Sequence, residues 1–255
     1  TAGEATLDCA GESFAVAGTN RSLTVHPYLF VTEARDPGEA DDRDREWVHP
    51  PAIRDRETVP WLAEAYDRVA PDLATVRADR DHGSAWVAAR ALEVLRDRAA
   101  TADEWAAVAA LARDLRDARP AMAVVANRVN RAMAGTETPA DVCRAAAAEL
   151  DDAAAATGAA ASAAAARLSG PGATSSRSGT VLAALEEADV PVVVGESRLG
   201  CEGVATAESL GDRATLVSDA VLPGTLAGLA GRPVAESVLL GADAVLPDGS
   251  VVNRT

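Results

Sequence analysis

The sequence contains no lysine, no glutamine and a single isoleucine, Ile53. All 24 basic residues are therefore arginines, and 39 aspartates and glutamates bring the formal net charge to -15. Such a chain lacks the basic stripe on which non-specific nucleic-acid binding depends, so we expect no nucleic-acid partner. A strongly acidic surface without lysine suits a halophile, because salt screens the repulsion between carboxylates. The alternative to a halophile protein is an ordinary acidic cytosolic protein, but that interpretation does not explain why lysine is absent.

Cysteine and histidine are also scarce, with three of each in 255 residues. Widely separated cysteines argue against both a disulfide framework and a zinc site. The histidines show no metal-ligand spacing either, and no apolar run reaches the ~20 residues that a membrane span needs. We therefore expect a cytoplasmic protein without a metal, a cofactor or a membrane partner. Thr1 is not a start methionine and no signal peptide is evident, so a missing N-terminus is expected.

The chain is 48% apolar, which suffices for a sizeable core. Three regions differ in the pattern of their apolar and polar residues. Residues 1–70 mix β-like runs at Ser22–Val25 and Tyr28–Val31 with polar turns and a short helix near Thr58–Val69. This region is too small and too polar to form a complete domain.

Residues 75–168 are predicted to be helical. Ser84 is expected to cap the first helix, and Thr101-Ala-Asp-Glu104 has the pattern of a capping box. Pro120 and Pro139 are expected in the first turns of later helices. The last helix is alanine-rich from Ala145 to Ala166, which is compatible with close helix packing or with a solvated linker.

Residues 170–255 alternate between strands and helices, which predicts a doubly wound parallel, Rossmann-like sheet. Strands are expected at Val190–Val194, Thr215–Val217 and Ser237–Leu240. The expected helices are Thr180–Ala188, Gly203–Leu210 and Leu222–Leu229. The carboxyl ends of parallel strands meet at one sheet edge, so polar residues after these strands are the candidates for a ligand site.

The first candidates surround the start of the helix at Thr180. The hydroxyls of Ser176 and Ser178, the charge of Arg177 and the backbone N–H groups of this helix could hold a phosphate. Simple N-capping by Ser178 is the alternative. Arg198 could form a bidentate pair with a second phosphate or a carboxylate, or an ion pair with a neighbouring glutamate, Glu196 or Glu202.

The remaining candidates lie near the end of the chain. Asp243 and Asn253 are expected on turns after neighbouring strands, where they could hold sugar hydroxyls. Capping of local turns is the alternative for both residues and for Asp219. Gly241 is expected to serve a turn whatever the function.

The motifs of residues 75–255 resemble the initiation factor 2B family, meaning its alpha, beta and delta subunits and their archaeal relatives. Ribose-1,5-bisphosphate isomerase and methylthioribose-1-phosphate isomerase share that fold. The resemblance implies a helical domain before the sheet, a sugar phosphate or nucleotide as ligand, homo-oligomers and contact with initiation factor 2. The matching motifs are Asp81-His-Gly-Ser84, Thr174-Ser-Ser-Arg-Ser178, Glu196-Ser-Arg198 with Gly203, Ser218-Asp219, and Gly241-Ala-Asp243 with Asp248-Gly249 and Asn253.

The chain departs from the family pattern at several positions. The isomerases use a cysteine where this chain has Ser176, and an Arg-Gly-Ala phosphate contact where it has His82-Gly-Ser84. Asp243, the catalytic aspartate if the protein is an isomerase, is kept, and Arg254 preserves the charge of the family's lysine. Serine is a poor substitute for a thiol in proton transfer unless a base is paired with it. A non-catalytic regulatory protein is therefore predicted, with a sugar-phosphate isomerase of nucleoside or AMP salvage as the alternative.

The sheet domain is expected to be cut short, because the family's sheet continues beyond the Asn253 motif and this chain ends at Thr255. The strand that should precede Thr174 is also weak, since the sequence there reads Ser169-Gly-Pro-Gly172.

Residues 1–70 resemble the closing part of a Nudix domain. The matching segments are His26-Pro-Tyr-Leu-Phe30, Glu46-Trp-Val48 and Glu57-Thr-Val-Pro-Trp61. The metal-binding Nudix box would lie before Thr1, so Mg²⁺ is expected only if a complete domain exists upstream. A Nudix hydrolase whose catalytic half is missing is thus a third hypothesis, and this fusion resembles a haloarchaeal arrangement.

Overall fold

A computed structural model describes residues 5–17, 22–32, 46–175, 178–198, 200–228 and 235–253. Three of the predicted site residues, Ser176, Arg177 and Arg254, lie outside these ranges.

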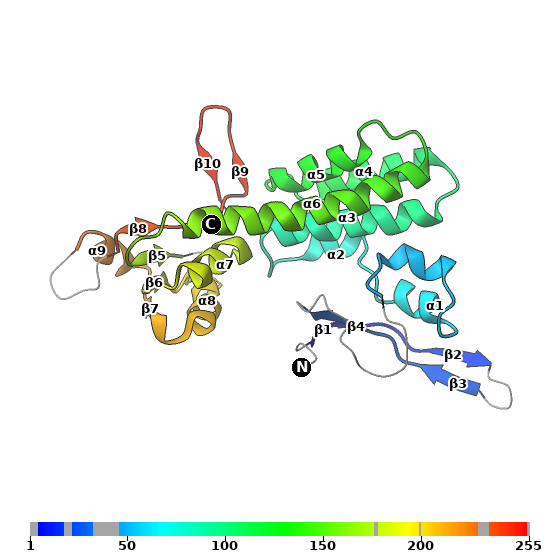
Figure 1. The fold of residues 1–255 in the computed structure, drawn as a ribbon, viewed down its shortest axis with the longest axis horizontal. Helices are drawn as coiled ribbons and strands as arrows, with labels where there is room; N and C mark the ends of the chain where they lie inside the picture. Colours follow the sequence, from blue (N-terminus) through cyan, green and yellow to red (C-terminus); the bar gives the residue numbers. More distant parts are fainter. Residues whose placement is uncertain are drawn as a thin grey trace.

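The N-terminal segment contains two small antiparallel pairs of strands (Figure 1). Strand β1 (Ala5–Ala10) pairs with β4 (Tyr28–Thr32), and β2 (Phe14–Ala17) pairs with β3 (Ser22–Val25). Strands β3 and β4 agree with the sequence prediction. The 3-10 helix η1 (Pro50–Asp55) and the helix α1 (Leu62–Asp67) follow, and α1 is shorter than the predicted 58–69.

A polar cluster around the buried Arg96 joins this segment to the helical part of the chain. The hydroxyl of Tyr66 donates to Asp97 at 2.6 Å, and the nearly buried guanidinium of Arg96 donates to Asp97 at 2.7 Å. His49 joins the cluster, with its Nδ1 3.3 Å from Arg96 and its Nε2 3.7 Å from Asp151. Burial and the hydrogen bond to Asp97 raise the pKa of Tyr66, so it remains a donor at neutral pH.

Five helices form the central bundle, and apolar side chains spaced three and four residues apart fill its core. Leu92 and Leu95 on α3, Leu115 on α4 and Val125 on α5 are fully buried. The helices are α2 (Leu73–Ala78), α3 (Ser84–Thr101), α4 (Trp105–Ala118), α5 (Ala123–Met133) and α6 (Pro139–Ala165).

Several helix ends differ from the sequence prediction. Ser84 is the first residue of α3 rather than its cap, because Gly83 holds the cap position without a side-chain bond. The predicted box at Thr101 is wrong, since Thr101 ends α3, and Pro120 lies in a turn ahead of α5. A reciprocal capping box does form at Thr138, whose hydroxyl accepts from the N–H of Asp141 at 3.2 Å. Pro139 opens α6 as predicted.

The last region contains a four-stranded parallel sheet in the order β7-β6-β5-β8. The weak entering strand exists as β5, and it is fully buried at the centre of the sheet. The strands are β5 (Gly172–Thr174), β6 (Val192–Gly195), β7 (Ala214–Val217) and β8 (Ser237–Val238). Between them lie α7 (Gly179–Ala188), α8 (Glu202–Leu210), the 3-10 helix η2 (Gly211–Arg213) and α9 (Leu222–Leu226).

The strand order reverses between β5 and β8. From β5 the chain moves to β6 and β7 on one side, and it then returns to place β8 on the other side. In open α/β sheets this switch point leaves a crevice at the carboxyl ends of the two strands. The polar segments after β5 and β8 are therefore brought together.

The chain after β8 forms a hairpin that projects from the molecule (Figure 1). Its strands are β9 (Ala244–Val245) and β10 (Val251–Val252), and they pair only with each other among the described residues. Asp243 and Asn253 consequently lie at the two ends of the hairpin's base, and the N–H of Asp243 donates to the carbonyl of Val252 at 2.8 Å. Asp243 thus follows a strand of the parallel sheet, β8, whereas Asn253 follows β10, a hairpin strand outside that sheet.

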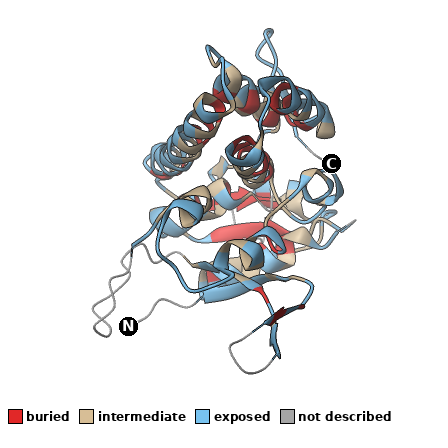
Figure 2. Ribbon diagram, turned by 90° about the vertical axis from the view of Figure 1, so that its right-hand side faces the viewer, coloured by how far each residue is buried: buried red, intermediate tan, exposed pale blue. Residues whose placement is uncertain are grey.

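Helix α6 connects the bundle with the sheet. It packs along α3 at one end and against α7 at the other (Figure 1). Buried residues gather where the helices face one another and on the central strands of the sheet (Figure 2). The alanine-rich half of α6 is therefore a packed helix rather than a solvated linker, since Ala161 and Ala165 are buried.

Candidate functional site

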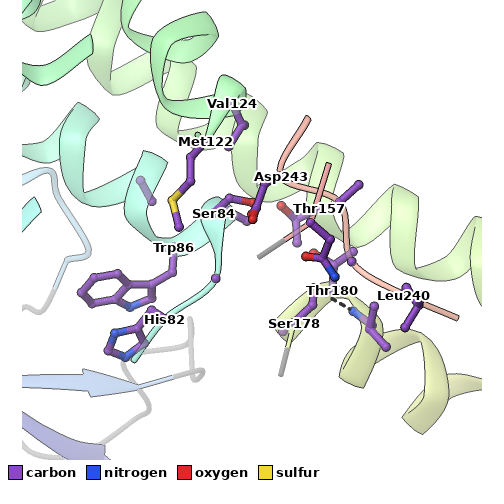
Figure 3. Close-up of a pocket in the computed structure, with 18 of the residues that line it drawn as sticks. His82, Ser84, Trp86, Met122, Val124, Thr157, Ser178, Thr180, Leu240 and Asp243 are labelled. Atoms are coloured by element: carbon purple, nitrogen blue, oxygen red, sulfur yellow. Dashed lines mark hydrogen bonds between the residues drawn. The ribbon is translucent and has the colours of Figure 1, made fainter. Parts of the chain in front are cut away.

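A pocket of about 850 Å³ lies at the switch point, between the helical bundle and the carboxyl edge of the sheet. Segments from distant parts of the sequence form its walls (Figure 3). They include residues 81–86 before and within α3, Met122 and Val124 at α5, residues 178–181 at α7, residues 239–243 after β8, and Leu150, Ala153, Ala154 and Thr157 on α6.

The helices α3 and α7 both begin at this pocket. Ser178 is the N-cap of α7, and its hydroxyl accepts from the N–H of Val181 at 3.4 Å. Gly83 is the N-cap of α3, and a side-chain carbon added to it would lie 4.0 Å from Cα of Ser178. Because the first N–H groups of a helix lack intrahelical acceptors and carry partial positive charge, two adjacent N-termini favour an anion.

Polar side chains surround these helix starts. Asp243 and Asn253 line the pocket together, although their positions are ten residues apart in the sequence. Ser84 and Thr180 add hydroxyls from the first turns of α3 and α7. Figure 3 labels Ser84, Thr180 and Asp243 among the residues that line the pocket. Hydroxyls, a carboxylate and an amide are the groups that hydrogen-bond sugar hydroxyls.

Apolar side chains line separate parts of the same pocket. In Figure 3, Met122 and Val124 lie on the side of Ser84, and Leu240 lies on the side of Thr180. Pockets for small molecules usually combine such apolar walls with a few polar groups that fix orientation.

His82 and Trp86 form one end of the pocket (Figure 3). Their rings are stacked, with centroids 3.7 Å apart and planes at 10°. The carboxylate of Asp79 accepts from the backbone N–H of His82 at 2.9 Å and lies 2.6 Å from the imidazole Nδ1. Burial would raise the pKa of Asp79, but these hydrogen bonds from His82 outweigh it and lower that pKa.

Arg198 and Asp219 lie at the same sheet edge, but they are not among the residues that line the pocket. The exposed guanidinium of Arg198 forms an ion pair with Glu196 at 2.8 Å, which was one of its two predicted roles. Asp219 accepts from the backbone N–H groups of Arg198 at 2.7 Å and Ser197 at 2.8 Å. These two bonds lower the pKa of Asp219. Asp219 thus holds the loop after β6 in place.

The same loop is held from the other side by α8. The N–H of Gly203 donates to the carbonyl of Glu196 at 3.3 Å. A side-chain carbon on Gly203 would lie only 1.8 Å from the carbonyl oxygen of Gly195. Gly203 therefore allows the helix to approach the end of β6 closely. The hydroxyl of Ser197 also donates to the carbonyl of Ser175 at 2.6 Å, which ties this loop to the pocket wall.

Within the described ranges, no group of three or more histidine, cysteine or acidic side chains could hold a metal ion. Nor does any helix of the described residues have the length and apolarity to cross a membrane. Cys201 is exposed and lies outside the pocket lining.

The sequence analysis placed Ser178, Gly241, Asp243 and Asn253 among the candidate residues of one ligand site, and all four line this pocket. It missed the wall that the helical region supplies, including Trp86 and Thr157. Neither residue carried a local signal, because they lie on different helices, α3 and α6, and only the packing of these helices beside the sheet brings them to the pocket.

The sequence of residues 80–255 matches the model of the initiation factor 2 subunit family. This chain belongs to that family. Among characterised protein sequences none matches the chain.

Solved structures of initiation factor 2B proteins have a similar fold. A translation initiation factor eIF-2B from Pyrococcus horikoshii OT3 is 24% identical, with a TM-score of 0.63 over 71% of this chain and 68% of that one. The eIF2B beta subunit from Chaetomium thermophilum is 16% identical, with a TM-score of 0.51 over 79% and 70%. A 5-methylthioribose 1-phosphate isomerase from P. horikoshii OT3 is 15% identical, with a TM-score of 0.51. That match covers 71% of this chain and only 59% of the isomerase.

Membership of the initiation factor 2 subunit family confirms the resemblance seen in residues 75–255, together with the helical region and the parallel sheet that it implied. The fold is therefore similar both to that of an eIF2B subunit and to that of a 5-methylthioribose 1-phosphate isomerase. The Nudix resemblance concerns residues before the matched range and remains a prediction.

Proposed function

We propose that this chain is a regulatory protein of the initiation factor 2B type, which binds a sugar phosphate or a nucleotide in the switch-point pocket without isomerase chemistry. The observation that supports it most is the meeting of two helix N-termini with Asp243 and Asn253 in one pocket. The N-termini suit the phosphate, and the carboxylate and amide suit the sugar hydroxyls.

The absence of isomerase chemistry is argued from the thiol. The described residues that line the pocket include no cysteine, and the sequence has Ser176 at the position of the isomerase cysteine. Asp243 is the observation that favours the alternative, an isomerase of phosphorylated pentose, because a lining carboxylate could accept a proton from the substrate. Ser176, Arg177 and Arg254, which lie outside the described residues, remain proposed ligand contacts on sequence grounds. Arg198 and Asp219 lie outside the pocket lining, so they remain proposed only for a ligand that extends beyond the pocket along the sheet edge.

Calorimetry tests the binding step. The protein is titrated at fixed high salt with ribose 5-phosphate, AMP and ribose, and the two phosphorylated compounds are expected to bind while ribose is not. Asp243→Asn should weaken binding by about tenfold, the value of a hydrogen bond to a charged group. Asp248→Asn is the matched control, because Asp248 lies in the turn of the same hairpin and outside the pocket lining. Equal affinities of the two variants would contradict the assignment of the pocket.

An activity assay tests the chemical step. Incubation with ribose 1,5-bisphosphate should give no ribulose 1,5-bisphosphate. Turnover at ~1 per second or faster would establish the isomerase instead.

The assembly is also a proposal. One similar structure is described as a tetrameric eIF2B-beta2-delta2 complex. We propose that this chain likewise forms oligomers and contacts initiation factor 2, which sedimentation and pull-down with purified initiation factor 2 would test.

A further inference from the structure

The pocket lies between the helical bundle and the sheet region, so its shape depends on what holds these two parts together. Helix α6 packs against α7 on one side. At the pocket itself, the N–H of Ala123, the first residue of α5, donates to the carbonyl of Asp243 at 3.1 Å. Among the described residues, this is the one backbone–backbone hydrogen bond that joins the bundle to residues 170–253.

Asp243 is a junction between three parts of the molecule. Its backbone N–H donates to the carbonyl of Val252 at 2.8 Å, which closes the base of the hairpin. Its carbonyl accepts from α5, and the residue lines the pocket. A displacement of its backbone would therefore move the carboxylate that we propose as a contact for the sugar hydroxyls.

The two partners of this bond are held to different degrees. Ala123 follows Met122, which is 5% exposed and packs in the bundle core, and the nearby Val125 is fully buried. The hairpin strands pair only with each other among the described residues, and their Val245 and Val251 are 69% and 60% exposed. A segment with few buried contacts opens locally at little cost. The bond thus holds the less stable hairpin base against the firm start of α5.

The donor is a group that α5 does not need for its own structure. At the first helical position an N–H has no acceptor within the helix, so the carbonyl of Asp243 supplies the missing partner. Met122 and Val124, on either side of Ala123, both line the pocket (Figure 3). The bond accordingly lies at the pocket wall, where a ligand that touches both bundle and sheet would stabilise it.

We infer that the backbone N–H of Ala123 positions Asp243 for the ligand by holding the hairpin base at the start of α5, and that ligand binding in turn strengthens this bond. This inference rests on the proposed function, because it adds a positioning contact and a mode of regulation to the same pocket. Coupling is reciprocal, so a bond that raises ligand affinity is itself stabilised when the ligand binds. The hairpin is therefore more ordered in the ligand-bound protein.

Ala123→Pro removes the N–H with little harm to α5. Proline is favoured at the first helical position, and the preceding Met122 already has a non-helical backbone, with φ -103° and ψ 85°. A ring carbon takes the place of the proton, so the carbonyl of Asp243 can no longer approach. In calorimetry at fixed high salt, this variant should bind AMP about three- to tenfold more weakly, the effect of one hydrogen bond. The conservative Ala123→Ser keeps the N–H and should retain the affinity.

A second measurement asks whether the loss acts through Asp243. Ala123→Pro is combined with Asp243→Asn, which already lacks the carboxylate. If the bond serves to position that carboxylate, the proline should reduce affinity by a clearly smaller factor in the Asp243→Asn background than in wild type. A general defect at the start of α5 would reduce affinity by the same factor in both backgrounds, and that result would overturn the inference.

Hydrogen exchange measured by mass spectrometry tests the bond without a ligand. The peptide of residues 239–253 should exchange faster in Ala123→Pro than in wild type or Ala123→Ser, while exchange of the buried strand β6 stays unchanged. AMP should slow exchange of the same peptide in wild type and slow it less in Ala123→Pro. Thermal unfolding shows whether each variant is folded. If the proline variant is not, replacing Ala123 by lactic acid puts an ester oxygen in place of the N–H without added ring atoms, and the same results are expected.

The inference is overturned if the variant without the N–H matches wild type in AMP affinity or in the exchange of residues 239–253. Failure of wild type to bind AMP or ribose 5-phosphate would overturn the proposed function, and with it the ligand-dependent part of the inference. The exchange of the ligand-free variants would then still decide whether this bond holds the hairpin base.

Discussion

Replacing Gly203 by alanine provides a sharp test of how the sheet edge is built. The added carbon would lie 1.8 Å from the carbonyl oxygen of Gly195, whereas real side-chain carbons essentially never come within 3.0 Å of such an atom. The backbone of α8 or of the loop must therefore move by at least 3.0 − 1.8 = 1.2 Å. Both colliding groups are backbone, so no side-chain rotation relieves the clash.

The expected cost is about 3 kcal/mol, the upper end of what overpacking does in a folded protein. For a chain of this size, such a loss lowers the melting temperature by about 6–12 °C. AMP affinity should fall too, because the displaced loop includes Ser197, whose hydroxyl donates to the carbonyl of Ser175 on the pocket wall.

Gly158→Ala is the matched control in the same protein. Gly158 lies in the exposed part of α6, and an added carbon there meets no atom within 4 Å. This change should stabilise the protein by about 0.5–1 kcal/mol, since alanine is the better helix former. Differential scanning fluorimetry at high salt measures both. A Gly203→Ala melting temperature equal to that of wild type would refute the close approach of α8 to β6.

Three further outcomes are expected. Glu149→Ala should lower the free energy of unfolding in urea by about 3 kcal/mol, because it leaves the largely buried Arg128, 2.6 Å from Glu149, without this partner. Glu196→Ala removes an exposed ion pair and should lower it by less than ~1 kcal/mol. Because the fold lowers the pKa of Asp79, its ionised carboxylate stabilises the protein at a pH above the usual carboxyl pKa, and this stabilisation is lost as the pH falls and the group is protonated. The difference in melting temperature between wild type and Asp79→Asn should therefore shrink below pH ~4. With a formal charge of -15, the melting temperature should rise between 0.1 M and 1 M NaCl, as the screening length falls from ~10 Å to ~3 Å, and an unchanged value would contradict the halophile argument.

The alternation of apolar runs and helical segments was enough to predict the sheet region, because local patterns decide which residues form strands. Val192 and Val194 are buried as expected for a central parallel strand. The strand at Gly172–Thr174 was hidden by its composition. Its small residues carry little strand propensity, and burial between β6 and β8 decides its conformation.

The site could be predicted only in part, because its walls come from segments far apart in the sequence. Ser178 and Asp243 follow strands, so the rule for parallel sheets brings them to one edge. Trp86 and Thr157 belong to α3 and α6, helices whose packing against the sheet has no local signature. Asp243 shows a second limit, since its placement at a hairpin base depends on pairing between Val245 and Val251 that the sequence alone did not indicate.

Helix α6 has a mechanical consequence. Its 27 residues form one rod of about 40 Å, which contributes Thr157 to the pocket and reaches the far end of the bundle. Gly158 introduces no break, so the rod cannot fold in its middle to close on a ligand. A change of occupancy must instead tilt the whole rod or move the hairpin and the turn before α3. A small tilt of α6 at the pocket becomes a larger displacement at the distant end of the helix. Ligand binding would then move the surface at that end, where another molecule could detect it.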